Sequence, residues 1–368
     1  MGENEKGEIF SYDVMIHILK RLPVKSLMRF NCVSKNWANL FRTPHFIAQH
    51  LRHSNQSPFL LLQRIRRSPT STPSSFCLIG PDLTVHEFPY LDFASNGAKV
   101  VGSCNGLLCL RHSNHALSIC NPATRQVTQS DDDDDNDGND GIVVLDDIHV
   151  NQVEVYSLAS GSWRQVDATN LQNLCPFSNA VAAGGGMFWK ATASPELGSS
   201  QDPDECLVSF DIGRDDFRLL RGPESHLSLT TYSCNSVLAE YVDKLAIFHQ
   251  FMMGNSDNFM TGIVQGSLID LWVLDNTQTY AVEGERWIKL YTLGPFSRIL
   301  YPISIWGDQI VCREELFELD GEYGRVKTTL SILNPYSSEL KNLPAHRNDN
   351  YYVSFNYAES LVSSQHSA

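Results

Sequence analysis

Residues 10–51 read FSYDVMIHILKRLPVKSLMRFNCVSKNWANLFRTPHFIAQHL, and their apolar side chains recur at helical spacing. Val14, Ile18 and Leu22 lie four residues apart, which predicts one apolar stripe along a helix of about three turns. Ser11 can cap the start of this helix, and Pro23 ends it because proline lacks a backbone donor. Three further short helices are predicted from residues that open helices well, namely Pro23, Ser34 and the pair Thr43-Pro44.

This helical stretch holds more apolar surface than so small a unit can bury by itself. A domain of about forty residues is marginally stable on its own. Part of the apolar surface is therefore expected to pack against the rest of the chain or against another protein. The residues alone leave both arrangements open.

The order of residues 19–37, LKRLPVKSLMRFNCVSKNW, resembles the F-box, the helical motif that docks onto the Skp-type adaptor of cullin-based ubiquitin ligases. Where the family opens with Leu-Pro, this chain has Phe10-Ser11. The match is carried, in order and spacing, by Asp13, Ile18, Leu19, Arg21, Leu22, Pro23, Val24, Lys25, Ser26, Leu27, Arg29, Phe30, Cys32, Val33, Ser34, Lys35 and Trp37. The resemblance implies apolar contacts with the adaptor from Phe10, Val14, Ile18, Leu22, Pro23, Val24, Leu27, Phe30, Val33 and Trp37.

After Pro58 the chain repeats one hairpin pattern of strand, turn and strand. Four turns open at Asn121, Ser157, Asp211 and Asn334, and apolar residues recur one residue before and six residues after each of these. Asn and Asp suit a turn start because their side chains bond the backbone that follows. The apolar pairs are Cys120 with Val127, Tyr156 with Trp163, Phe210 with Phe217, and Leu333 with Leu340; a fifth copy ends at Asp275, with Trp287 as its apolar partner across a longer turn.

A second pattern lies between several of these copies, a turn containing Gly or Asp followed by an apolar strand. It reads VGSCNGLLCL, VAAGGGMFWKA, DKLAIFHQF and PISIWGDQIVC. Each combined unit of about 50 residues predicts a four-stranded sheet, which is typical of a β-propeller. The fold class expected is a small all-α domain followed by a large all-β, propeller-like domain.

The repeated units resemble the F-box-associated, kelch-like domain of plant F-box proteins. The motifs shared with that family are SCNGL at 103–107, NPAT at 121–124, VEVYSL at 153–158 with Trp163, and IDLWVL at 269–274. The tail YAESL at 357–361 is similar to that of the S-locus F-box group. Between Gln129 and Val153 the family places two strands, whereas only Ile142 to Leu145 could form one here, so one blade is expected to be incomplete.

These patterns predict the domain organisation of the chain. Residues 1–8 are expected to be disordered, 9–53 to form the F-box, and 54–358 to form the β domain, followed by a tail at 359–368. Flexible loops are predicted at 64–75, which is rich in Ser, Thr and Pro, and at 129–141, which is acidic.

Charge is distributed unevenly along the chain. Residues 1–67 hold eleven Lys/Arg and four Asp/Glu, a net charge of +7, whereas the remainder holds 17 against 38, a net charge of −21. An acidic β domain argues against a nucleic-acid ligand and suits either a basic protein partner or solubility alone. No apolar run is long enough to span a bilayer, no secretory signal opens the chain, and nine scattered cysteines favour a reducing compartment, so the cytoplasm, or secondarily the nucleus, is expected.

Three patterns could suggest chemistry, and each has a simpler interpretation. Cys104 lies in a sequence like a nucleophile elbow, but Asn105-Gly106 is a hairpin turn and a strand should follow it. Asp133, Asp135 and Asp137 match part of an EF-hand loop, yet Val144 stands where Glu is required. The spacings of Cys104, Cys109, His112, His115 and Cys120 contain no C-x₂-C pair typical of zinc sites. No catalytic residue, metal or cofactor is therefore expected.

The function that the resemblance implies is substrate recognition within a Skp–cullin–F-box ubiquitin ligase, without catalysis on this chain. Its partners would be the Skp-type adaptor, a cullin scaffold reached through the adaptor, and an unidentified protein target. The S-locus resemblance implies a ribonuclease of the pistil as one target class. The alternative is an interaction module, or a decayed family member, that no longer joins a ligase; the Phe10-Ser11 opening and the missing strand pair motivate it.

Overall fold

The computed structural model describes residues 12–65, 75–87, 98–112, 116–129, 153–158, 160–172, 174–176, 178–193, 205–223, 231–253, 266–275, 285–318, 325–344 and 351–364. The predicted disorder at 1–8, residues Phe10 and Ser11, most of the loops 64–75 and 129–141, and the strand proposed at 142–145 lie outside these residues. The chain divides into two compact units. The first unit comprises residues 1–63, 72–131 and 355–368, and the second comprises residues 64–71 and 132–354.

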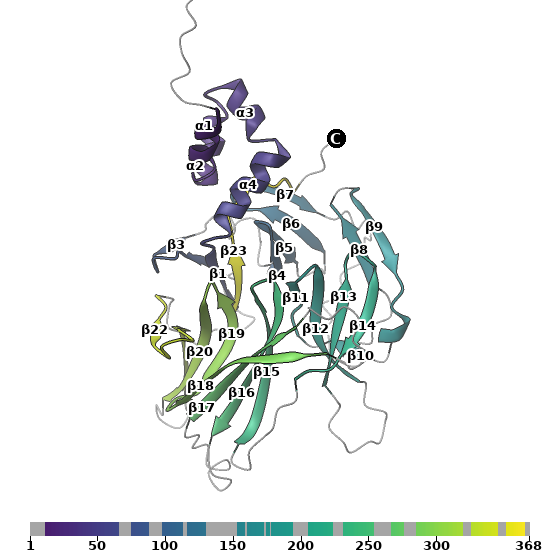
Figure 1. The fold of residues 1–368 in the computed structure, drawn as a ribbon, viewed down its shortest axis with the longest axis vertical. Helices are drawn as coiled ribbons and strands as arrows, with labels where there is room; N and C mark the ends of the chain where they lie inside the picture. The colour runs from purple at the N-terminus through teal and green to yellow at the C-terminus, as the bar shows by residue number, and fades with distance from the viewer. Residues whose placement is uncertain are drawn as a thin grey trace, which may run out of the picture. The chain divides into compact units, whose positions relative to one another are not determined.

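Residues 12–54, the helical segment, form four helices in the first unit (Figure 1). Ser34 and Thr43 cap α3 and α4 as predicted, accepting hydrogen bonds from the backbone N–H of Asn36 at 3.2 Å and of Phe46 at 3.3 Å. Pro23 is the cap residue of α2 but makes no side-chain cap bond. The bounds are α1 (Tyr12–Leu19), α2 (Val24–Phe30), α3 (Lys35–Leu40) and α4 (Pro44–Ser54).

The first helix is shorter than the apolar spacing predicts. It ends at Leu19, and the N–H groups of Arg21 and Leu22 bond carbonyls only three residues back. The tighter turn follows from Pro23, which disfavours helical geometry at the residue before it. Leu22 therefore leaves the α1 stripe and packs against the interior of the helical segment.

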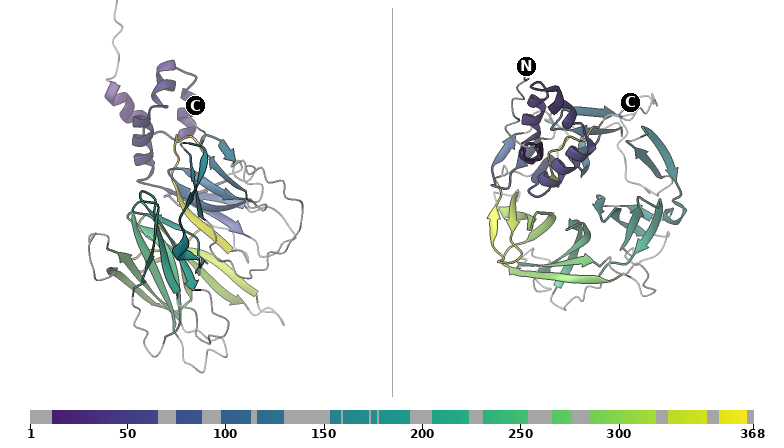
Figure 2. Two further views of the ribbon diagram at one scale, coloured as in Figure 1. Left: turned by 90° about the vertical axis from the view of Figure 1, so that its right-hand side faces the viewer. Right: turned by 45° about the horizontal axis from the view of Figure 1, so that its top comes forward.

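The buried centre of the helical segment is apolar. Its fully or nearly fully buried members are Leu19, Leu27, Leu40, Phe41 and Phe46, and the partly buried side chains around them are Met15, Ile16, Leu22, Phe30, Trp37 and Leu361. Leu361 comes from the other end of the chain. Both views of Figure 2 show the yellow C-terminal segment beside the purple helices.

Two four-stranded sheets lie wholly or mostly in the first unit. One has the order β23-β1-β2-β3, so the last strand lies beside the first, and the other has the order β4-β5-β6-β7. Gln63 joins them, because its buried side chain donates to Ala98 O and accepts from Val100 N, both at 2.8 Å. The bounds are β1 (Phe59–Ile65), β2 (Ser75–Ile79), β3 (Val85–Glu87), β4 (Lys99–Cys104), β5 (Leu107–Arg111), β6 (Leu117–Asn121), β7 (Gln126–Gln129) and β23 (Tyr351–Tyr357).

The second unit is built from antiparallel sheets in chain order. The sheets are β8-β9, β10-β12-β13-β14 with β11 beside β12, β15-β16-β17-β18, and β19-β20-β21-β22. The bounds are β8 (Val153–Ser157), β9 (Ser162–Val166), β10 (Leu174–Pro176), β11 (Val181–Ala183), β12 (Gly186–Ala193), β13 (Glu205–Asp211), β14 (Asp216–Leu220), β15 (Thr231–Tyr241), β16 (Lys244–Met253), β17 (Gly266–Leu274), β18 (Trp287–Phe296), β19 (Leu300–Trp306), β20 (Gln309–Glu318), β21 (Arg325–Leu333) and β22 (Leu340–Asn342), with a 3₁₀ turn at Thr169–Leu171.

Strand pairing confirms the repeated hairpin to the residue. The five predicted apolar pairs face each other across the turns as Cys120 with Val127, Tyr156 with Trp163, Phe210 with Phe217, Leu333 with Leu340, and Leu274 with Trp287. The second pattern forms the hairpins β4-β5, β11-β12, β15-β16 and β19-β20. The predicted fold class, a small helical domain followed by a large all-β domain, is therefore confirmed.

The blade predicted to be incomplete corresponds to the two-stranded sheet β8-β9 within the described residues. Residues 130–152, where the two family strands would lie, are outside them, so incompleteness remains a prediction. Three loop borders shift slightly: β1 extends to Ile65, β2 begins at Ser75, and β7 includes Gln129.

Candidate adaptor-binding surface

Several large apolar side chains of the helical segment face solvent. Val14 and Ile18 are four residues apart on α1, so they share one face of that helix, and Ile18 is 50% exposed. Val33, in the turn before α3, is 66% exposed. Tyr12 and Met28 are exposed as well. Exposed apolar side chains concentrated in one short segment are typical of a protein-binding surface.

Two of the ten residues expected at the adaptor are inaccessible in this structure. Val24 and Leu27 have 0% exposed surface, and Leu27 forms part of the buried centre of the helical segment. The three-residue spacing of Val24, Leu27 and Phe30 places them on one face of α2, and that face points inward. Direct contact of Val24 and Leu27 with a partner is corrected to a supporting role beneath the surface.

Of the other eight predicted residues, some are exposed at the surface and some are half-buried beneath it. Val14, Ile18, Pro23 and Val33 are exposed, and Phe10 lies outside the described residues. Leu22, Phe30 and Trp37 are half-buried against the apolar centre. The rings of Phe30 and Trp37 are 5.4 Å apart, and the indole N–H of Trp37 points to the sulfur of Met15 at 3.2 Å.

Sequence reasoning missed Tyr12 and Met28 as exposed apolar residues. The signal for Met28 was available, because it lies off the face defined by Val24, Leu27 and Phe30. Tyr12 gave no such signal, since it stands at the very start of α1.

A buried histidine links the helices to the loop before α2. The Nε2 atom of His50 on α4 lies 3.0 Å from the carbonyl oxygen of Leu22, so Nε2–H donates, and His50 is 1% exposed. Burial lowers the pKa of His50, an effect partly offset by that hydrogen bond and by the charge of Glu359. His50 is therefore favoured in its neutral form in the folded protein.

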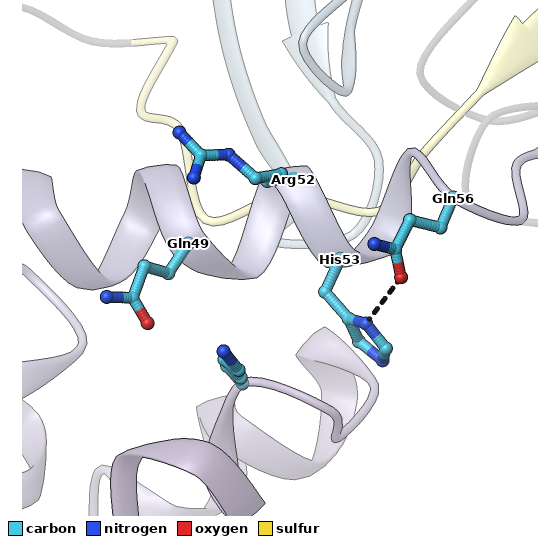
Figure 3. A pocket seen from close by; sticks show the side chains of 5 residues that line it. Gln49, Arg52, His53 and Gln56 are labelled. Atoms are coloured by element: carbon cyan, nitrogen blue, oxygen red, sulfur yellow. Dashed lines mark hydrogen bonds between the residues drawn. The ribbon is translucent and has the colours of Figure 1, made fainter. Parts of the chain in front are cut away.

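The helical segment also carries an open polar pocket of about 230 Å³ (Figure 3). Its lining residues come from the end of α1 and from the second half of α4 and the turn after it: Lys20, Gln49, Arg52, His53 and Gln56. The His53 ring Nδ1 lies 3.2 Å from Gln56 Oε1. This lining offers hydrogen-bond donors and positive charge, which suit a carbonyl or carboxylate group of a bound protein.

The residues considered for chemistry form neither a nucleophile elbow nor, within the described residues, a metal-binding group. Cys104 ends β4, and a strand follows the Asn105-Gly106 turn, so the arrangement is a hairpin and not a nucleophile elbow. Desolvation raises the pKa of the Cys104 thiol, the opposite of what activates a nucleophile. His112 bonds Ser118 at 2.8 Å. Within the described residues no three His, Cys, Asp or Glu side chains form a metal-binding group; His115 and the Asp133–Asp137 stretch are outside them.

Two family models match this chain. The F-box domain model matches residues 9–49, and the F-box associated beta propeller domain model matches residues 84–292. The chain belongs to the F-box-associated β-propeller family. Its helical segment is thus the F-box, and its strands form the β-propeller domain of that family. Within the part of the chain that the structure describes, no helix is both long and apolar enough to cross a membrane.

Curated relatives from Arabidopsis thaliana are similar over most of the chain. Putative F-box protein At3g52320 is 28% identical over 318 residues, covering 74% of this chain and 75% of its own. F-box protein At1g30790 is 25% identical over 337 residues, covering 80% and 76%. These relatives make this a plant-type F-box protein.

Among solved structures the chain is similar to Trypanosoma rangeli sialidase, at a TM-score of 0.30 and 11% identity over 54% of this chain and 34% of that one.

Proposed function

We propose that this protein is the substrate-recognition subunit of a Skp–cullin–F-box ubiquitin ligase. The F-box would hold a Skp-type adaptor through Val14, Ile18, Pro23, Val33, Met28 and Tyr12, with Leu22, Phe30 and Trp37 supporting the surface. Phe10, from the sequence prediction, would also contribute. The observation that carries the proposal is the exposed apolar face of α1 in a segment that matches the F-box model. The cullin scaffold would be reached through the adaptor, in the cytoplasm or the nucleus.

The mechanism would be positional and not catalytic. Holding a target beside a ubiquitin-loaded enzyme raises the effective concentration of the target's lysines, so no bond needs to be made or broken by this chain.

The target is proposed to bind at one end of the sheets. In β4-β5-β6-β7 the first and third turns, at Asn105 and Asn121, lie at the same end because consecutive strands are antiparallel. That end contacts the C-terminal residues. We place the protein target at the opposite end of this sheet, where β5 ends at Arg111 and β6 begins at Leu117. The acidic β domain favours a basic target, such as the ribonuclease class suggested by the S-locus resemblance.

Co-purification with a Skp-type adaptor tests the proposal. The double change Val14→Glu with Ile18→Glu should abolish adaptor binding, because charge at an apolar interface is costly to desolvate. Ile212→Glu is the matched control, since Ile212 is 49% exposed and lies in the β domain. Failure of the wild-type chain to bind any Skp-type adaptor would favour the alternative, an interaction module outside the ligase, which the Phe10-Ser11 opening motivates.

A further inference from the structure

Residues 358–364, here called the C-terminal strap, run from β23 to the F-box within the first unit. The strap has no helical or strand pairing of its own. Even so, Ser360 and Ser364 are 0% and 1% exposed. Backbone buried in this way needs hydrogen-bond partners from elsewhere, and the structure supplies them from two sides.

On the sheet side, one side chain holds the strap at two points. The amide nitrogen of Asn121 donates to Ser360 O at 3.0 Å and to Val362 O at 2.7 Å. The amide oxygen of the same side chain accepts from the N–H groups of Ala123 and Thr124, which closes the β6-β7 turn. Asn121 is 0% exposed, and its side chain bonds the turn through the amide oxygen and the strap through the amide nitrogen.

Two hydroxyl groups add further contacts with the sheet. Ser360 Oγ donates to Asn105 O at 2.7 Å, in the β4-β5 turn, and Thr128 Oγ1 donates to Ser364 O at 2.6 Å. Next to Asn105, a Cβ on Gly106 would come within 2.5 Å of Ser360 Oγ. The strap thus lies directly on both turns at this end of the sheet.

On the F-box side, the strap contributes one charge and one apolar side chain. Glu359 Oε2 accepts from the backbone N–H of Val24 at 3.0 Å. This N–H belongs to the first turn of α2, where the helix itself provides no acceptor, and Pro23 makes no side-chain cap bond. Leu361 packs against the apolar centre of the F-box. Alternate residues of the strap therefore face the F-box and the sheet.

The covalent connection between the F-box and the sheets is short and single. Helix α4 ends at Ser54 and β1 begins at Phe59, so residues 55–58 are the link. A single link of this kind is the usual place for a hinge. A second attachment at a different point removes the rotation that one link permits.

We propose that the C-terminal strap fixes the orientation of the F-box on the sheet β4-β5-β6-β7, with Asn121, Glu359 and Leu361 as its positioning residues. If the F-box binds the adaptor, its fixed orientation also fixes the distance between a bound target and the ubiquitin-loaded enzyme. This consequence for ubiquitin transfer rests on the function proposed above. The strap itself does not depend on that function.

The decisive variant is Asn121→Asp in the full-length chain. Aspartate keeps an acceptor for the N–H groups of Ala123 and Thr124, so the turn can close as before. It lacks the two donors and places a carboxylate against the carbonyls of Ser360 and Val362. The matched control is Asn334→Asp, because Asn334 Oδ1 closes the β21-β22 turn in the same way, accepting from Tyr336 and Ser337.

Hydrogen exchange at the Val24 amide provides the first measurement. Asn121→Asp should speed exchange at this amide about tenfold or more, as expected when a hydrogen bond to a charged group is lost. Glu359→Ala should do the same, whereas Glu359→Gln, which keeps an acceptor, should restore most of the protection. Because Asn121 does not touch Val24, a local effect of the substitution would leave this amide unchanged.

The distance between spin labels introduced as unnatural amino acids at Arg29 on α2 and Arg111 on β5 provides the second measurement. The wild-type chain and Asn334→Asp should give one narrow distribution, and Asn121→Asp and Leu361→Ala a broad one. Unchanged exchange at Val24 together with an unchanged distribution in Asn121→Asp would overturn the proposal. Both measurements use the chain without adaptor, so a wild-type chain that binds no adaptor would contradict the proposed function and leave the strap unaffected.

Discussion

The carboxylate of Glu359 and the backbone N–H of Val24 form a 3.0 Å hydrogen bond across 335 residues of sequence. It brings the end of the chain to the start of α2, in the middle of the F-box. The motifs SCNGL, NPAT and YAESL meet in the same neighbourhood, since Asn105 and Asn121 both bond Ser360. Motifs far apart in the sequence therefore serve one junction between the F-box and the sheets.

Alanine substitutions at the neighbouring residues Leu27 and Met28 should have different effects, the first on the stability of the F-box and the second on adaptor binding. Leu27→Ala leaves a cavity at a position with 0% exposure, which should cost about 2–5 kcal/mol of unfolding free energy. Met28→Ala, at a position 39% exposed, should leave stability nearly unchanged and weaken adaptor binding. Chemical denaturation and adaptor titration measure the two effects. Equal loss of stability in both variants would contradict the assignment of inner and outer faces on α2.

Most of the fold could be predicted because hairpins are local. The turn residues Asn121 and Asn334 and the apolar positions one before and six after them define strand register within eight residues of sequence. Caps at Ser34 and Thr43 define helix starts in the same local way. Predictions failed where a neighbour changed the geometry, as where Pro23 shortens α1 and moves Leu22 off its stripe.

The site was harder to predict than the fold. Apolar spacing shows that Val24, Leu27 and Phe30 share a face but not whether that face points inward or outward. The polar pocket of Lys20, Arg52 and His53 joins two helices, and no single stretch of sequence contains it. The bond from Glu359 to Val24 depends on the tertiary path of the strap, which no local pattern encodes.

Acid should destabilise the F-box through His50. Its usual pKa is 6.5, and burial, the largest cause, lowers the folded-state pKa. The free energy of unfolding is unaffected by His50 titration well above pH 6.5. It falls as the pH drops from 6.5 towards the folded-state pKa, because over that range the unfolded chain binds the proton and the folded chain does not. The loss is at most about 1.4 kcal/mol per pH unit.

Thermal unfolding of the wild-type chain and His50→Gln at pH 7.5 and 5.5 measures this contribution. Glutamine can still donate to Leu22 O and does not titrate, so His50→Gln should lose less stability between the two values. Buried His249 in the second unit has a lowered pKa as well and is present in both proteins, so it cancels in the comparison. An equal loss in the two proteins would contradict the role of His50.

Adaptor binding should protect Cys32 from alkylation but leave the alkylation rate of Cys104 unchanged. Both residues are exposed, and Cys32 adjoins Val33 on the candidate adaptor surface, whereas Cys104 lies in the β4-β5 hairpin. Mass spectrometry after a short iodoacetamide pulse, with and without adaptor, gives the two rates. If neither cysteine is protected, the adaptor does not contact the α2-α3 turn. Cys312, which is buried, should stay unmodified until the protein unfolds, as burial raises the pKa of its thiol.

Gly106 and Gly307 should respond differently to the same substitution. Both lie in hairpin turns at positive φ, +77° and +61°, so an alanine at either position costs about 1–2 kcal/mol of backbone strain. Only at Gly106 would the new Cβ collide, at 2.6 Å from Ala358 O and 2.5 Å from Ser360 Oγ. A Cβ on Gly307 would meet no described atom within 4 Å beyond its chain neighbours.

Gly106→Ala should therefore lower the unfolding free energy more than Gly307→Ala, because the strap must move away from the β4-β5 turn. The additional readout is hydrogen exchange at Val24, which should speed up in Gly106→Ala and stay at the wild-type rate in Gly307→Ala. Equal stability loss with equal protection of Val24 would mean that the strap tolerates displacement at Ser360 without releasing α2. Faster exchange of the Val24 amide in Gly106→Ala alone would show that the C-terminal strap protects the start of α2, because Gly106 forms no hydrogen bond with Glu359 or Val24 itself.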